Sequence, residues 1–191
     1  MKNGLTYVSF FSEATGGTSG NCDIHDGNVA VFEGGVLIAD IYAAKNSGQP
    51  LGTIIGRNDV RLIGSSVVGT PIADVVGDRR TKTITISDIP DVELVCDGRL
   101  KLPNIYDFNV DQARRKLAAF GWQPRDMSEE GSDSGYMQSL WEAGYVEYAE
   151  CSGTGFGFCN LEYQRGDARL TVTAYGEEGQ TVSDFRVECA E

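Results

Sequence analysis

Hydrophobic and polar residues alternate most clearly in the C-terminal third of the chain. A period of two runs through residues 159–164 and again through 170–175, which is typical of strands that bury one face. The Arg-Gly-Asp sequence between the two runs has the chemistry of a turn. An aromatic-rich extended run at 145–150 precedes them, and residues 182–189 follow as a last strand. These segments predict an antiparallel sheet.

The N-terminal half carries shorter β patterns. Residues 38–43, 51–56 and 72–77 share the order aliphatic, small, polar, aliphatic, any, small, at unequal spacings that exclude a solenoid. We expect the remaining strands at 5–11, 60–63, 82–87 and 92–96. Short strands that alternate with Gly, Asn and Asp turns predict a small β-sandwich, a barrel or a curled sheet.

The hydrophobic period changes to that of a helix after residues 97–103, which we interpret as a junction between two domains. Asn109 is a good N-cap, and Gln112 stands at the position that completes a capping box. An apolar stripe follows on one face: Val110, Ala113, Leu117 and Phe120. Gly121 ends the pattern, which therefore predicts a helix over about 110–120.

A second, weaker helical pattern covers residues 136–143, with Leu140 and Trp141 turned inward and Gly144 at its end. Together the patterns predict an α+β protein. Its β-rich domain would span residues 1–100, and a domain of two helices and an antiparallel sheet would span 101–191.

Composition restricts the class of protein. Hydrophobic residues make up 41% of the 191 positions, and 24 glycines against 5 prolines are typical of a turn-rich β protein. No stretch is long and apolar enough to predict a membrane span. The start of the sequence makes a poor signal peptide, so the protein is either cytosolic or begins after a removed leader.

Five cysteines in a strand-rich chain favour the second alternative, and with it a periplasmic or extracellular location. Cys151 and Cys159 bracket a small-residue loop, and we predict a disulfide between them because two adjacent strand ends bring their side chains within reach. Among the others we favour Cys22–Cys96, which stays inside the first domain, with Cys96–Cys189 as the competing pair. Buried free thiols are the alternative interpretation.

Acidic residues dominate the charge, which is −12, so nucleic acids and anionic membrane surfaces are poor partners. The stretch 126–150 contains seven acids and no base: Asp126, Glu129, Glu130, Asp133, Glu142, Glu147 and Glu150. Either Arg114, Arg115 and Lys116 neutralise these acids, or the acids face solvent and attract a basic partner. We expect the second case, because the helix turns those cations away from its apolar stripe.

The candidate binding residues come from this stretch and from the aromatic residues beside it: Glu129, Glu130, Asp133, Tyr136, Trp141 and Tyr145. An acidic patch with one or two exposed aromatic side chains suits a protein partner with a basic surface. A solvated loop and a cation site without EF-hand spacing are the alternatives. Most of the aromatic residues are expected in the core.

Other motifs indicate neither catalytic nor metal chemistry. A strand follows Gly153, Gly155 and Gly157 where a phosphate loop needs a helix. Cys22 and His25 are too few for a zinc site, so we favour a turn with a structural cysteine. Motifs of serine hydrolases, metalloproteases and nucleotide-binding proteins are missing from the sequence. We therefore predict no catalytic residue, no metal and no cofactor.

Three features resemble known proteins. One set of residues resembles the opening of a PASTA domain, a wall-binding module: Leu102-Pro103-Asn104-Ile105, Ala113, Leu117 and Gly121-Trp122. Gly144-Tyr145, the Cys-Ser-Gly-Thr-Gly loop from Cys151 and the strand after Cys159 are similar to a segment of uncharacterised secreted bacterial proteins, which implies export. The order of two helices, then antiparallel strands with a disulfide, resembles the β-lactamase-inhibitor-protein fold, an architecture that implies no function.

Two functions remain as hypotheses. The first is a non-enzymatic exported binding protein, such as an inhibitor or immunity protein, that masks a basic site through its acidic and aromatic face. The second is a small hydrolase that acts on cell-wall or glycan material with paired carboxylates. An enzyme would bring two carboxylates together in a cleft, whereas a binding protein would present a flat or convex acidic-aromatic patch.

Overall fold

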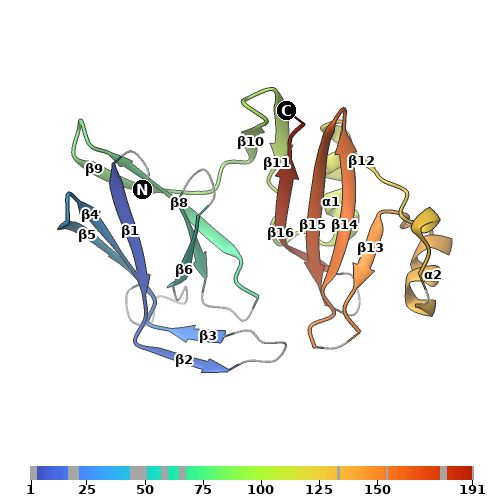
Figure 1. The fold of residues 1–191 in the computed structure, drawn as a ribbon, viewed down its shortest axis with the longest axis horizontal. Coiled ribbons are helices and arrows are strands. Elements are labelled where there is room, and N and C mark those ends of the chain that lie inside the picture. The colour runs from blue at the N-terminus through green and yellow to red at the C-terminus, as the bar shows by residue number, and fades with distance from the viewer. Residues whose placement is uncertain are drawn as a thin grey trace. The chain divides into compact units, whose positions relative to one another are not determined.

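A computed structural model of the protein describes residues 4–16, 22–43, 51–56, 60–64, 68–132, 134–153, 155–176 and 180–190. The fold is α+β with a β-rich N-terminal region, as predicted (Figure 1). The chain divides into two compact units, Met1–Ile89 and Pro90–Glu191. We call them the N-terminal unit and the C-terminal unit and describe each by itself.

The N-terminal unit consists of antiparallel strands. One sheet has the order β1-β4-β5, with β1 (Leu5–Phe10), β4 (Asn28–Glu33) and β5 (Val36–Tyr42). A second has the order β6-β7-β8-β9, with β6 (Leu51–Gly56), β7 (Val60–Gly64), β8 (Pro71–Asp78) and β9 (Thr83–Ser87). β2 (Glu13–Gly16) and β3 (Cys22–His25) pair separately. The sequence did not predict this pair, because its Gly-, Ser- and Thr-rich residues have no period of two.

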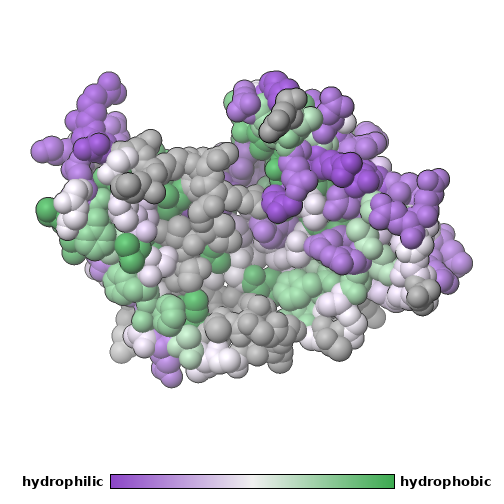
Figure 2. Space-filling view, viewed as in Figure 1, coloured by the Kyte–Doolittle hydropathy of each residue, from purple (hydrophilic) through white to green (hydrophobic). Residues whose placement is uncertain are grey.

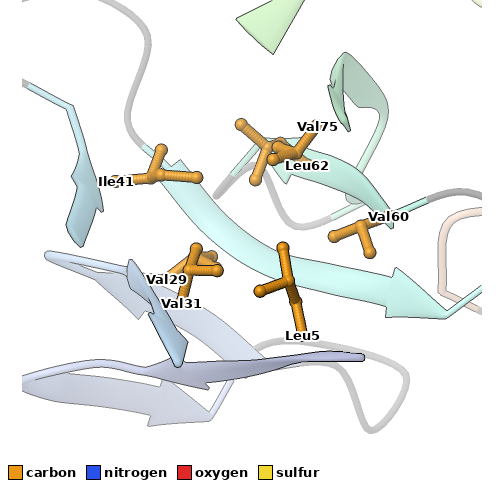
Figure 3. Packing of buried hydrophobic residues seen from close by; sticks show 7 residues of the cluster. All are labelled: Leu5, Val29, Val31, Ile41, Val60, Leu62 and Val75. Carbon is orange, nitrogen blue, oxygen red and sulfur yellow. The ribbon is translucent and has the colours of Figure 1, made fainter. Parts of the chain in front are cut away.

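A shared apolar core joins the two larger sheets of this unit (Figure 3). The first sheet contributes four side chains and the second contributes three: Leu5, Val29, Val31 and Ile41, then Val60, Leu62 and Val75. Burying each side chain of this size contributes about 1.5–3 kcal/mol relative to leaving it exposed. Two sheets that enclose one core have the arrangement of a small sandwich.

The C-terminal unit combines helices with an antiparallel sheet. The helices are α1 (Val110–Ala119), α2 (Gly135–Glu142) and the short 3-10 helix η2 (Ser128–Glu130). The sheet has the order β12-β14-β15-β16, and β13 also pairs with β14: β12 (Gln123–Pro124), β13 (Tyr148–Cys151), β14 (Cys159–Arg165), β15 (Ala168–Tyr175) and β16 (Thr181–Glu188). β10 (Val92–Val95) and β11 (Leu100–Pro103) form a separate hairpin.

The predicted alternation decides which face of the sheet is buried. Leu161 and Tyr163 of β14 lie opposite Val172 and Leu170 of β15, and all four are buried. Three residues of the apolar stripe of α1 are also buried, Val110, Ala113 and Leu117, while Phe120 is partly buried at the C-cap. Figure 1 shows this helix behind β14 and β15. The helix therefore covers the apolar face, while Thr and Glu side chains occupy the other face of the same strands.

The helix ends follow the sequence signals closely. The Asn109 side chain accepts a hydrogen bond from the Gln112 N–H at 2.9 Å, and the Gln112 side chain accepts one from the Asn109 N–H at 3.3 Å. This is the expected capping box, which fixes where α1 begins. In α2, the buried side chain is that of Met137. Leu140 and Trp141 are only partly buried, because this helix packs mainly along β13.

The predicted junction at residues 97–103 is the turn and second strand of the β10–β11 hairpin. Cys96, Asp97 and Gly98 all have positive φ, as a tight turn requires. The boundary between the units falls earlier, after Ile89. The polar residues of this hairpin turn have the composition of a linker, which is why we interpreted them as a junction.

Two disulfides join cysteines of the C-terminal unit. Cys151–Cys159 is confirmed, with Cα atoms 4.0 Å apart on paired strands. The Cys22–Cys96 prediction is wrong, since Cys96 bonds to Cys189, with their Cα atoms 5.4 Å apart. The reason is the boundary of the units: Cys96 belongs to the C-terminal unit, where Cys189 follows β16.

Candidate binding site

The described residues form a cleft of about 230 Å³ in the C-terminal unit. Its lining comes from the start of α1, from α2, from the start of β13 with the segment before it, and from the residue before β16: Asn109, Val110, Asp111, Tyr136, Leu140, Tyr145, Tyr148 and Gln180. We call it the Asp111 cleft. Because every lining residue belongs to one unit, its geometry does not depend on how the two units are arranged.

The start of α1 positions the acidic side of the cleft. The Val110 N–H donates to the Gln180 carbonyl at 2.9 Å, and Asn109 forms an isolated bridge with Thr181. These bonds tie the first turn of α1 to the first residues of β16. Asp111 and Gln180 therefore line the same cleft although they lie far apart in the sequence.

Three tyrosines form the opposite side. The Tyr145 hydroxyl donates to Oδ1 of Asp111 at 3.0 Å, and the rings of Tyr145 and Tyr148 meet edge to face with centroids 6.1 Å apart. Tyr136, in the first turn of α2, has 48% of its surface exposed. Gly144 has a φ of +91° directly before Tyr145, and the Tyr145 N–H donates back to the Leu140 carbonyl. This turn after α2 directs the chain into the cleft wall.

A buried ion pair lies beside this wall. Arg114 Nε lies 3.2 Å from Oε1 of Glu147, whose side chain is fully buried. The Tyr163 hydroxyl donates to the same Oε1 at 3.1 Å, while Oε2 has no partner among the described residues. The Arg114 guanidinium also lies 5.3 Å from the ring centroid of Tyr145 and donates to the Gly144 carbonyl. Arg114 thus connects α1 to the segment that carries two of the three tyrosines.

The hydroxyls of Tyr145 and Tyr148 keep their protons at neutral pH. Hydrogen bonding to the Asp111 carboxylate raises the pKa of Tyr145, and burial raises the pKa of Tyr148. No Lys, Arg or His occurs among the described residues of the lining. The negative charge of the lining is therefore that of Asp111, whose Oδ2 has no hydrogen-bond partner in the described part of the chain.

The Gln180 side chain of the lining is fixed by two contacts. Its side chain is buried, and Nε2 donates to the Gly157 carbonyl at 3.3 Å and lies 2.9 Å from Sγ of Cys159. These contacts fix the amide against the Cys151–Cys159 disulfide. Oε1 of the same amide is buried and has no hydrogen-bond partner among the described groups.

The structure brings together only some of the residues proposed from the sequence. Tyr136 and Tyr145 line the cleft. Glu129 and Glu130 are exposed on η2, outside the lining. Trp141 is partly buried and donates through Nε1 to the Tyr148 carbonyl at 2.9 Å, which gives it a structural role. Asp133 lies outside the described residues.

We had expected the whole acidic stretch to face solvent, but part of it does not. Glu147 is buried and paired with Arg114, one of the three cations predicted to point away from the core. Glu150 accepts a hydrogen bond from Asn160 at 2.8 Å on the neighbouring strand. Six lining residues were not proposed as binding residues from the sequence: Asn109, Val110, Asp111, Leu140, Tyr148 and Gln180.

A second exposed surface lies on the N-terminal unit. Hydrophobic side chains gather over β1, β4 and β5 (Figure 2), and the most exposed belong to β1 and β5: Val8, Phe10, Val36, Leu37, Ile38 and Tyr42. Patches of this kind mark interaction sites. This one contains no feature that defines a partner, and we assign no site to it.

Within the part of the chain that the structure describes, no three His, Cys, Asp or Glu side chains are placed to hold a metal ion. The side chains of Cys22 and His25 lie outside that part, although their backbone forms β3 and not the predicted turn. None of the described helices is long and apolar enough to cross a membrane. Comparison with protein-family models, with curated proteins and with solved structures finds no match.

Proposed function

We propose that the chain is a non-enzymatic binding protein of the inhibitor or immunity class. It binds a protein partner with a basic surface through the Asp111 cleft, with Glu129 and Glu130 as an acidic surface elsewhere on the same unit. The observation that carries the proposal is the lining, which combines one carboxylate, three tyrosines and no described cation. Tyrosine offers a large, rigid contact area with a polar tip, and it is enriched where binding energy concentrates.

The size of the cleft supports the same conclusion. Its volume of about 230 Å³ lies below the range of about 300–1,000 Å³ that is usual for small-molecule sites. We had expected a flat or convex patch on a binding protein, and the surface is instead hollowed by one small pocket. A pocket of this size suits a single anchoring side chain of a partner.

The alternative function, a glycan hydrolase, needs two carboxylates that flank the scissile bond. Asp111 is the one carboxylate among the described residues of the lining. The side chain of Glu147 is fully buried and is held by Arg114 and Tyr163, so it does not reach a substrate in the cleft. The arrangement therefore favours binding over hydrolysis.

A periplasmic or extracellular location completes the proposal. Cys96–Cys189 and Cys151–Cys159 are both disulfides, and structural disulfides persist mainly in oxidising compartments. An inhibitor or immunity protein in such a compartment meets exported partners directly.

Site-specific photo-crosslinking tests the proposal. The crosslinker p-benzoylphenylalanine replaces Tyr136 at the cleft, or Tyr42 on the N-terminal unit as the control, because both side chains are well exposed. We expect irradiation in the producing cells to give one discrete protein adduct at Tyr136 and not at Tyr42. An adduct at neither position, or at Tyr42 alone, contradicts the proposed function.

A further inference from the structure

We infer that the Asp111 cleft accepts the cationic end of an arginine or lysine side chain presented by the partner. The inference rests on the proposed function and deepens it, because it names the chemical group that enters the cleft.

The charge of the lining excludes an anionic guest. Asp111 carries the negative charge, and no described cation lines the cleft to offset it. A helix N-terminus attracts anions through its unbound N–H groups and its dipole. At α1, however, the Val110 N–H is bound to the Gln180 carbonyl and the Gln112 N–H to the Asn109 side chain. Asp111 itself occupies the first turn and compensates the positive end of the helix.

The acceptor that the lining offers to a guest is the Asp111 carboxylate. Its Oδ2 makes no hydrogen bond to the described residues, and its Oδ1 accepts one from the Tyr145 hydroxyl at 3.0 Å. A guanidinium has five N–H donors and no acceptor, and an ammonium has three. A positively charged donor group therefore complements both the charge and the hydrogen-bonding capacity of the cleft.

The tyrosine wall suits the same guest. The faces of aromatic rings attract cations at about 6 Å or less from the ring centroid. The protein already uses this interaction on one side of Tyr145, where the Arg114 guanidinium lies 5.3 Å from the centroid. Tyr136, which has 48% of its surface exposed, supplies further aromatic surface in the lining for a cation that arrives from outside.

Peptide binding to the full chain tests the inference. The probes are acetyl-Ala-X-Ala-amides in which X is arginine, lysine, glutamate or citrulline, the neutral isostere of arginine. Backbone amide spectra of the ¹⁵N-labelled protein report binding residue by residue. We expect the arginine and lysine probes to shift the resonances of Asp111, Tyr136 and Tyr145. The citrulline and glutamate probes should bind at least tenfold more weakly. Equal shifts with citrulline, or no shift with either cation, overturn the inference.

Two matched pairs of variants locate the effect. Asp111→Asn should weaken binding of the arginine probe at least tenfold. Its control, Asp107→Asn, makes the same charge change outside the lining, at an exposed residue with a φ of +61° that asparagine tolerates. Tyr136→Ala should also weaken binding of the arginine probe, and Tyr42→Ala should not. An equal loss of probe binding in both variants of a pair overturns the assignment to this cleft. If Asp111→Asn does not fold, the comparison of the arginine and citrulline probes on the unaltered chain decides the question.

The result is distinguishable from that of the crosslinking experiment. If a protein is crosslinked at Tyr136 but the cationic probes do not bind, the inference is overturned and the proposed function stands. If the arginine probe binds but no protein is crosslinked there, the cationic guest is supported and the proposed function is contradicted.

Discussion

Arg114 Nε lies 3.2 Å from Oε1 of Glu147, a carboxylate whose side chain is fully buried while Arg114 keeps a third of its surface exposed. This pair links α1, which carries Asp111, to the segment that carries Tyr145 and Tyr148. Removing one partner of a buried pair leaves an uncompensated charge, which costs far more than the net contribution of the pair. We therefore expect loss of either partner to destabilise the C-terminal unit.

Arg114→Ala should lower the free energy of unfolding by about 3 kcal/mol, the lower end of the range for such pairs, because the arginine is partly solvated. Arg115→Ala removes the same charge from an exposed neighbour and should change it by about 0.5 kcal/mol or less. Both tryptophans, Trp122 and Trp141, lie in the C-terminal unit, so fluorescence during urea unfolding reports on that unit. Equal losses in the two variants would show that Glu147 does not depend on Arg114.

Alkaline pH should destabilise the C-terminal unit through Tyr163. Burial, followed by the neighbouring Glu147 carboxylate, raises the pKa of this tyrosine above its unfolded value of about 10. Above pH 10 the unfolded chain releases the proton and the folded chain keeps it, so stability is fully present below pH 10 and falls as pH rises, by up to about 1.4 kcal/mol per pH unit. Tyr163→Phe should reduce this slope, measured as urea midpoints between pH 9 and 11. An unchanged slope would show that Tyr163 does not cause the loss of stability at alkaline pH. Tyr136→Phe, at an exposed tyrosine, is the control.

Two fragments should differ sharply in stability. Residues 90–191 retain the β10–β11 hairpin and the Cys96–Cys189 disulfide, and should melt cooperatively. Residues 101–191, which we took from the sequence as a domain, lack β10 and Cys96. A disulfide that closes a loop of about 100 residues contributes up to about 5 kcal/mol, so the shorter fragment should melt far lower or not cooperatively. Similar calorimetric transitions for both fragments would argue against the boundary after Ile89.

Replacing Glu129 and Glu130 with glutamine should slow association with the crosslinked partner several-fold at low salt. The dissociation rate and the unfolding free energy should change little, because both residues are exposed and lie outside the cleft lining. The difference in association rate should shrink at physiological salt, where charges more than about 8 Å apart are screened. Surface plasmon resonance at two salt concentrations measures this, and identical association rates would leave the two acids as solubility residues.

Local signals in the sequence were reliable where a single element decides the structure. The Asn109–Gln112 capping box, the strands on either side of the Arg165–Ala168 turn and the Cys151–Cys159 disulfide each depend on residues close in the chain. Tyr136 and Tyr145 were predicted for the site because they are aromatic residues beside the acidic stretch, and both line the cleft.

The remaining features depend on contacts between distant segments. Cys96 and Cys189 are 93 residues apart, so unit boundaries decide their pairing. Asp111 and Gln180 meet only because β16 starts beside α1. A register shift between Tyr148 and Glu150 breaks the period of two, which hid the inward position of Tyr148. Arg114 reaches Glu147 from a position beside, not opposite, the apolar stripe of α1, a contact that helical periodicity does not encode.

Competition at the cleft tests the central claim most directly. The arginine probe is added in excess to the purified protein, with p-benzoylphenylalanine in place of Tyr136 and the crosslinked partner present, before irradiation. We predict that the arginine probe suppresses the adduct and that the citrulline probe leaves it unchanged. An adduct that forms equally with both probes would contradict a binding site in which the partner places a cation beside Asp111.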